Sequence, residues 1–152
     1  MGRWTDRLAE LGIPLPEVVK PVAAYVPAVR TGSLVFTAGQ IPMVAGSPAG
    51  LGKVGAEVSA EEAQQYARIC ALNALAAVDS LVGLDSIVRV VKVVGFVASA
   101  DGFTGQPGVV NGASELLGEV FGEAGQHARS AVGVAELPLG VPVEVELVVE
   151  VE

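Results

Sequence analysis

The stretch that decides the fold is Arg129–Glu152, which reads RSAVGVAELPLGVPVEVELVVEVE. From Val141 onward, apolar residues fall at every second position, and carboxylates fill most positions between them (Glu144, Glu146, Glu150 and Glu152). Successive side chains on a strand point to opposite faces. The pattern therefore predicts a strand with one face on an apolar core and a row of carboxylates on the other.

The residues before this strand predict a partner for it. Arg129–Glu136 also alternates, and Leu137–Gly140 has the residue types of a turn, so we expect a hairpin in which Glu136 pairs with Val141. Opposed side chains would then lie about 5 Å apart at Cβ. Such a face has room for a small ligand with a carboxylate of its own, and the alternative is an ordinary solvated face. The residues on this face would be Arg129, Ala131, Gly133, Ala135, Glu144 and Glu146.

Length and composition favour one domain over residues 1–152, in which 1–22 form an N-terminal helix and linker. The chain is 51% apolar with a mean hydropathy of +0.56, yet Arg89 and Lys92 interrupt its longest apolar run, Ile87–Ala100. That run is too short for a membrane span. We expect the excess apolar surface to be buried in an oligomer.

Charge and cysteine content narrow the class of partner and the location. The net charge of −8 disfavours a nucleic-acid partner, because such binding depends on basic patches. One cysteine allows no intrachain disulfide, and the N-terminus lacks the apolar segment of a secretory signal, so we expect a cytoplasmic protein.

The remaining elements predict an α+β sandwich, with a mixed sheet and two helices on one face. Ser59 and Glu62 form a capping box that starts a helix ending at Val82, and its small residues, which include Cys70 as a buried inert thiol, form a packing stripe. Leu81 is also expected in this stripe. The other expected elements are a helix before Gly12 anchored by Trp4, strands at 23–30 and 33–38 joined by Thr31-Gly32, a glycine-rich loop at 39–58, a strand at 87–98 and a helix at 109–124.

Few residues carry recognisable chemistry. The sequence has no metal constellation and no nucleotide-binding glycine motif, so we expect neither a metal nor a cofactor. His127 has no partner that the sequence can place beside it. What remains is Arg129, whose planar fork suits a carboxylate, and Glu144, which suits the activation of water. Tyr25 and Asn111 are further candidates, with packing and helix-start roles as the alternative.

Several motifs, in this order, resemble those of the YjgF/RidA family, also known as the endoribonuclease L-PSP family. They are Ala38-Gly39-Gln40-Ile41-Pro42, Ala128-Arg129-Ser130, Val134–Pro138 and Val143–Glu146. The resemblance covers about residues 23–151. It implies a chorismate-mutase-like fold and a homotrimer with ligand clefts between subunits.

The resemblance also implies an activity and a set of site residues. In the deaminase branch of the family, an arginine binds the carboxylate of an imine or enamine such as 2-aminoacrylate, and water releases ammonia to leave a 2-keto acid. Arg129 and Glu144 match the catalytic arginine and glutamate. Substrate-binding positions are expected at Tyr25, Ala38, Gly39, Asn111 and Ala131.

Departures from the family pattern leave three hypotheses. The family often has serine at the Ala38 position and cysteine at the Ala131 position, and the N-terminal helix is additional here. The first hypothesis is a hydrolytic imine or enamine deaminase. The second, favoured by the two alanines, is a trimer that binds a small carboxylate metabolite without turnover. The third is an endoribonuclease, which the acidic composition disfavours.

Overall fold

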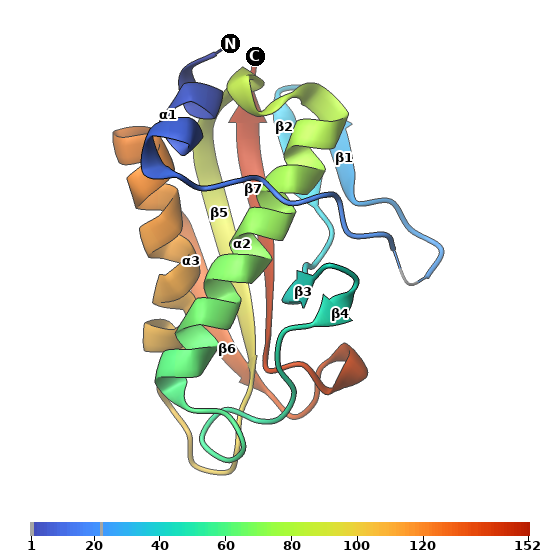
Figure 1. Ribbon diagram of the computed structural model, residues 1–152, viewed down its shortest axis with the longest axis vertical. Coiled ribbons are helices and arrows are strands. Elements are labelled where there is room, and N and C mark those ends of the chain that lie inside the picture. The colour runs from blue at the N-terminus through green and yellow to red at the C-terminus, as the bar shows by residue number, and fades with distance from the viewer. Residues whose placement is uncertain (1, 22) are drawn as a thin grey trace.

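The computed structural model describes residues 2–21 and 23–152 and shows helices packed over one face of a mixed sheet (Figure 1). Met1 and Val22, which belong to the expected N-terminal helix segment and linker, lie outside the described residues. The elements are α1 (Arg3–Leu11), β1 (Ala28–Thr31), β2 (Leu34–Thr37), β3 (Met43–Val44), β4 (Ser47–Pro48), α2 (Ala60–Val82), η1 (Leu84–Ser86), β5 (Ile87–Ala98), α3 (Gln106–Phe121), η2 (Gly122–Gly125), β6 (Ala128–Val134), η3 (Pro138–Gly140) and β7 (Val143–Val151).

Strand β7 lies at the centre of the main sheet, whose order is β1-β2-β7-β5-β6. Its burial alternates strictly, so the predicted core face is confirmed. The apolar residues of that face join the buried residues of α2 and α3 in one core. The glutamates lie on the opposite face of the sheet, which we call the outer face. The expectation of an α+β fold with a mixed sheet is confirmed.

The predicted hairpin between β6 and β7 is wrong. Strand β5 lies between them, antiparallel to β7 and parallel to β6. A parallel pair needs a crossover connection, and α3 supplies it between β5 and β6. The segment after β6, including η3, then passes beyond the end of β5 to reach β7. An alternating pattern specifies which face of a strand is buried, but it does not specify which strand lies beside it.

Helix α2 follows its sequence signals closely. Both hydrogen bonds of the capping box are present between Ser59 and Glu62, at 3.1 Å each, and the helix ends before Gly83. The small-residue stripe is buried as expected, including Cys70. Leu81 departs from the prediction because it lies in the last turn of the helix and is exposed. The small side chains allow α2 to pack closely against the sheet and α3.

Helix α1 closes one end of the core. Gly12 ends it with a left-handed conformation (φ 67°), as the sequence predicts. Trp4 is buried, donates from Nε1 to the carbonyl of Ile87 at 2.7 Å and meets the Phe121 ring edge-on at 4.8 Å. The packing role expected of Trp4 is confirmed.

Several expected boundaries shift. The first strand starts at Ala28, because Pro27 has no N–H for the ladder, and its hairpin turn is Gly32-Ser33, where Gly32 has a φ of 58°. Helix α3 begins earlier than expected, at Gln106, because Pro107 is tolerated in a first turn. The expected loop at 39–58 contains the short β3–β4 hairpin.

Candidate functional site

Arg129 lies on the edge strand β6 and points to the helix side of the sheet. Its Nη1 donates to Asn111 Oδ1 at 2.7 Å and to Ser114 Oγ at 3.2 Å, and its Nη2 donates to the carbonyl of Pro107 at 3.2 Å. All three acceptors belong to α3. A guanidinium has five N–H donors. Within the described part of the chain these bonds use three, which leaves Nε–H and one Nη2–H for a ligand.

Ser114 and His127 extend this group, and the sequence did not reveal them as site residues. His127 Nδ1 is 2.6 Å from the carbonyl of Gly125, which can only accept, so Nδ1 carries the proton of the neutral ring. Nε2, at 2.9 Å, then accepts from the Ser114 hydroxyl, whose oxygen in turn accepts from Arg129. We call Asn111, Ser114, His127 and Arg129 the arginine cluster.

The expectation that His127 lacks a partner is therefore corrected. Asn111 and Ser114 are three residues apart on α3, so they share one helix face. That spacing is visible in the sequence. The meeting of this face with β6 depends on the crossover, which the sequence does not specify.

Glu144 lies on the outer face of β7, against the backbone of Gly39. A Cβ at residue 39 would meet the end of the Glu144 side chain, which would have to move, so glycine permits the present close approach. The two residues line a small cavity of about 80 Å³ together with Tyr25, Gln40 and Pro138, among others. We call this the glutamate pocket.

The surroundings of Glu144 favour its protonated form. Partial burial raises the pKa of this carboxyl above its ordinary value, and the neighbouring Glu146 carboxylate raises it further. A carboxyl whose pKa moves toward neutral can both take a proton and return it. Glu144 therefore has the electrostatics of an acid–base group.

The predicted site residues fall into two groups in one chain. Arg129 pairs in register with Val93, and Glu144 pairs with Phe96 on the same strand β5. Positions 93 and 96 differ by an odd number, so Arg129 and Glu144 project from opposite faces of the sheet. The expectation that they share a face is wrong, because β5 separates their strands.

The other predicted positions divide in the same way. Asn111 joins the arginine cluster, while Tyr25 and Gly39 line the glutamate pocket. Ala131 lies on the helix face of β6 and packs against the core. Ala38 is half-buried, and its backbone N–H donates to the carbonyl of Pro27 at 2.8 Å. Neither alanine offers a polar side chain.

Two other classes of site find no support among the described residues. No group of three or more histidine, cysteine, aspartate or glutamate side chains in residues 2–21 and 23–152 is placed to hold a metal ion. Over the same residues, no helix has both the length and the apolar character that crossing a bilayer requires. Cys70 is fully buried, and loss of solvation raises the pKa of its thiol well above the ordinary value. Its predicted inert character agrees with this.

Comparison with known proteins supports the fold and its class. A crystal structure of the protein Atu1372, of unknown function, from Agrobacterium tumefaciens is 44% identical, with a TM-score of 0.88 over 98% of this chain and 92% of that chain. E. coli TdcF with bound serine is 26% identical, with a TM-score of 0.63 over 90% of this chain and 93% of that chain. The protein TCP17 of Trypanosoma cruzi is 43% identical over 151 residues, which are 98% of this chain and 94% of that protein.

The architecture is thus that of the chorismate-mutase-like α+β proteins. Residues 5–151 match the family described as "YjgF/chorismate_mutase-like, putative endoribonuclease". The chain belongs to this YjgF family.

Proposed function

We propose that this protein hydrolyses small reactive imines or enamines that carry a carboxylate, yielding a 2-keto acid and ammonia. The proposal rests on the hydrogen bonding of the Arg129 guanidinium. Its guanidinium is held in place by three acceptors of α3, and two N–H donors are left for a ligand. Two donors of one guanidinium are what a carboxylate needs for a bidentate contact. TdcF, which binds serine in its crystal structure, is a relative with a small amino-acid ligand.

The site is completed by a second copy of the chain. One chain presents Arg129 and Glu144 on opposite faces of its sheet, so neither can serve the other within that chain. The outer face also carries exposed apolar side chains, with Phe36 and Val132 each 45% exposed. Apolar surface of this kind is a common mark of an interface. A homotrimer, with the arginine cluster of one copy beside the glutamate pocket of the next, accounts for both features.

The chemistry then needs no group beyond these side chains and water. Arg129 binds the substrate carboxylate, which places the neighbouring C=N carbon beside Glu144. An enamine first takes a proton from solvent at its terminal carbon and becomes the iminium, C=NH2+. The Glu144 carboxylate then takes a proton from water as the oxygen bonds to the C=N carbon and the C=N electron pair moves to the nitrogen. The protonated Glu144 returns its proton to that nitrogen, the C–N bond breaks and ammonia leaves. The remaining hydroxyl releases its proton to solvent and becomes the keto oxygen.

A coupled assay tests this proposal. An amino-acid dehydratase that releases 2-aminoacrylate is run with and without the protein, and keto-acid formation is followed. We expect the protein to accelerate release, and Arg129→Ala and Glu144→Gln to abolish the acceleration. Arg89→Ala and Glu150→Gln, which change an exposed arginine and a glutamate of the same outer face, serve as matched controls. No acceleration by the wild-type protein, or equal acceleration by Arg129→Ala, would overturn the proposal for this substrate.

A second candidate is ligand binding without turnover. It is favoured by Ala38 and Ala131, which remove two polar side chains that the family resemblance leads one to expect. Calorimetry with 2-oxobutyrate separates the two candidates when combined with the coupled assay. Binding that is lost in Arg129→Ala, with no acceleration for any imine tested, would favour the binding role. Ribonuclease activity, which the family description names, is the least favoured because the chain carries a net charge of −8.

A further inference from the structure

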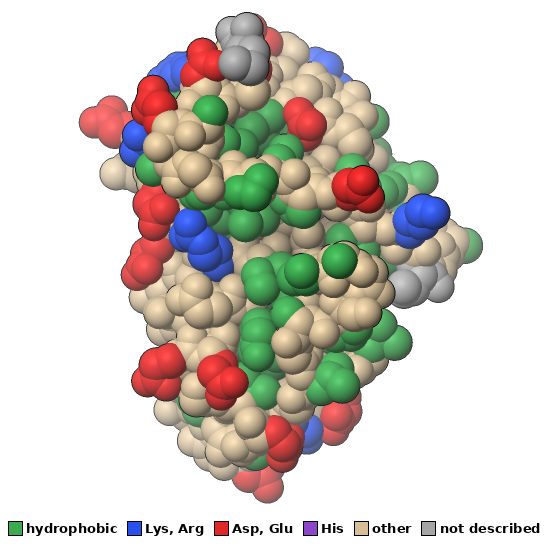
Figure 2. Space-filling view, in the orientation of Figure 1, with side chains coloured by type: hydrophobic (Ala, Val, Ile, Leu, Met, Phe, Trp, Pro, Cys, Tyr) green, Lys and Arg blue, Asp and Glu red, His purple; other side chains and the backbone are tan. Residues whose placement is uncertain are grey.

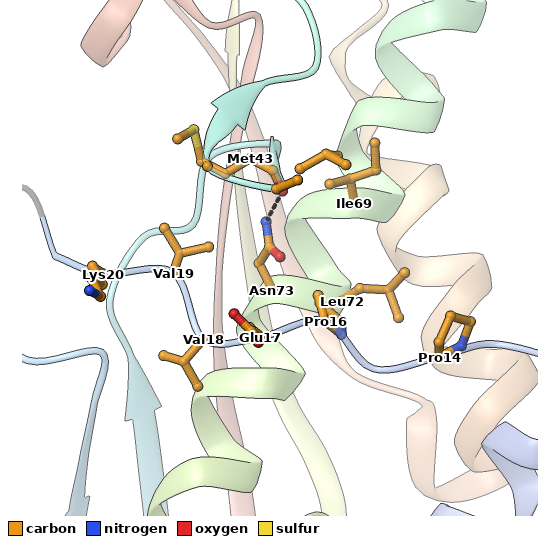
Figure 3. A pocket seen from close by; sticks show the side chains of 13 residues that line it. Pro14, Pro16, Glu17, Val18, Val19, Lys20, Met43, Ile69, Leu72 and Asn73 are labelled. Atoms are coloured by element: carbon orange, nitrogen blue, oxygen red, sulfur yellow. Dashed lines mark hydrogen bonds between the residues drawn. The ribbon is translucent and has the colours of Figure 1, made fainter.

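A cavity of about 890 Å³ lies away from both residue groups. It lies between α2, the β3–β4 hairpin and the extended segment of residues 13–21, which we call the strap (Figure 3). The strap follows α1 and crosses over α2 on the helix side of the molecule (Figure 1). Small-molecule pockets in proteins have volumes of about 300–1,000 Å³. This cavity is therefore large enough for a ligand in its own right.

The wall of the cavity is mainly aliphatic. Ile69 and Leu72 face it from α2, Met43 from the hairpin, and Val18 and Val19 from the strap. In the space-filling view, apolar side chains gather at the middle of this face, between the strap and the hairpin (Figure 2). Glu17 and Lys20 are the charged side chains of the lining, and both are exposed and of opposite sign. Their charges balance, so the lining favours an uncharged ligand with an apolar body.

Asn73 supplies a fixed polar group in this wall. It is only 1% exposed, and its Nδ2 donates to the carbonyls of Ile41 and Met43 at 3.1 Å each. These two bonds determine the orientation of the amide, because Nδ2 has two protons and both are used. The carboxamide oxygen Oδ1 must therefore point away from the hairpin carbonyls, and Figure 3 shows it turned to the side of the dashed bond that joins Nδ2 to the hairpin.

The oxygen of this amide is left as an acceptor for a ligand. No donor among the described residues bonds to Asn73 Oδ1. In the described part of the chain, every buried side-chain nitrogen or oxygen that solvent cannot reach has a hydrogen-bond partner. Oδ1 has none, so it is reachable from the cavity. Because solvent can reach Oδ1, a ligand N–H or O–H can also bond to it.

We propose that this cavity binds a small uncharged molecule with an aliphatic body and one hydroxyl or amide N–H that donates to Asn73 Oδ1. The aliphatic body packs against Ile69, Leu72 and Met43, and the strap covers it. The proposal is independent of the proposed deaminase activity, because neither Arg129 nor Glu144 lines this cavity.

A pair of isomeric probes tests the donor requirement. 1-Hexanol and methyl pentyl ether have the same atoms, but only the alcohol can donate a hydrogen bond. Each is titrated into isotope-labelled full-length protein, and the NMR signals of the Ile69 and Leu72 methyl groups and the Asn73 side-chain amide are followed. We expect the alcohol to shift these signals and to bind about three- to tenfold more tightly than the ether. Signals that do not move up to the solubility limit of the alcohol, or equal affinity of the two probes, would overturn the proposal.

Substitutions locate the binding. Leu72→Phe adds bulk inside the cavity, whereas Leu81→Phe makes the same change on an exposed part of α2 that does not line it. We expect Leu72→Phe to weaken 1-hexanol binding at least tenfold and Leu81→Phe to leave it unchanged. Equal affinities in the two variants would contradict the assignment. If Leu72→Phe does not fold, as judged by circular dichroism, Ile69→Phe takes its place. Arg129→Ala is expected to retain full probe binding whether or not the deaminase proposal holds.

Discussion

At the scale of single residues, Glu144 is a carboxyl group whose negative charge the fold opposes. Burial and Glu146 both raise its pKa above the ordinary 4.5. Between the pKa of Glu144 in the unfolded chain and its higher pKa in the native chain, only the native chain holds the proton. The free energy of unfolding therefore falls as the pH rises through this range. Above this range, the native state contains a partly buried carboxylate beside a second carboxylate.

The fall in the free energy of unfolding with rising pH gives a stability prediction. Glu144→Gln removes the charge but keeps the shape, so it is expected to raise the melting temperature at pH 7 and to have no effect at a pH below the ordinary carboxyl range. Glu150→Gln, on the same strand and face, is the control and should show no comparable gain at pH 7. Thermal unfolding at both pH values measures this. A Glu144→Gln variant that melts below the wild type at pH 7 would contradict the pKa assignment.

Ser114 gives the second residue-scale prediction, which rests on the proposed function. Its hydroxyl oxygen accepts from Arg129 at 3.2 Å, so Ser114→Ala frees one donor and loosens the guanidinium. One hydrogen bond contributes about 0.5–1.5 kcal/mol, so KM is expected to rise about three- to tenfold with little change in kcat. Ser80→Ala, which removes a hydroxyl bonded to its own helix, is the control. A fall in kcat with unchanged KM would argue against a positioning role.

The sequence was more informative about which residues are candidates for a site than about where they lie. The alternating pattern of β7 and the chemistry of the Arg129 guanidinium indicated Glu144 and Arg129 as candidates. The structure places Glu144 in the glutamate pocket and Arg129 in the arginine cluster. The relation between them depends on β5 entering between β6 and β7, and period-two alternation is compatible with any neighbour. Ser114 and His127 were missed for the same reason, because their contacts join α3 to a strand whose position was unknown.

At the scale of secondary-structure elements, α1 is held at its start by a side chain from another element. Its N-cap residue, Gly2, has no side chain for capping, and Asp85 of η1 accepts from Trp4 N at 2.8 Å, Thr5 N at 3.0 Å and Thr5 Oγ at 2.6 Å. Asp85 thus satisfies two of the free N–H groups of the first turn. Partial burial works to raise its pKa, but these hydrogen bonds outweigh it and lower the pKa below the ordinary 3.8.

Asp85→Ala is therefore expected to lower the free energy of unfolding by about 1 kcal/mol, the usual cost of a lost helix cap. A lowered native pKa means that the stabilisation is present above the ordinary carboxyl range and is lost as the pH falls through the native value. Urea unfolding at pH 7 should show the difference in full, and unfolding at strongly acidic pH should show it reduced. Asp101→Ala, in an exposed turn, is the control. An equal difference at both pH values would contradict the role of the charged form.

Local signals predicted α2 closely because its capping box and Gly83 act within a few residues. The same locality explains the predictions that failed. At the boundaries that shifted, the Pro27 carbonyl accepts from the Ala38 N–H and the Pro107 carbonyl accepts from Arg129, in addition to the local effects of the two prolines. Such contacts join separate segments, and no short window of sequence contains both partners.

At the scale of the whole molecule, the two faces of the sheet differ in how they are covered. Helices α2 and α3 cover one face, while the outer face exposes Val29, Phe36 and Val132 beside its glutamates. Part of the apolar surface of the chain is thus exposed on this uncovered face. If copies of the chain meet there, each cleft draws its arginine cluster and its glutamate pocket from different copies.

Mixing two inactive variants tests this arrangement directly. Arg129→Ala copies keep an intact glutamate pocket, and Glu144→Gln copies keep an intact arginine cluster. When the two are unfolded together in equal amounts and refolded, random association joins an intact cluster to an intact pocket in about one quarter of the clefts. We therefore expect the mixture to regain about one quarter of the wild-type rate of keto-acid release. Two different Arg129 variants refolded together, such as Arg129→Ala with Arg129→Gln, contain no intact cluster and should stay inactive. A mixture as inactive as its components, when each variant assembles like the wild type in sedimentation, would mean that each site belongs to a single chain.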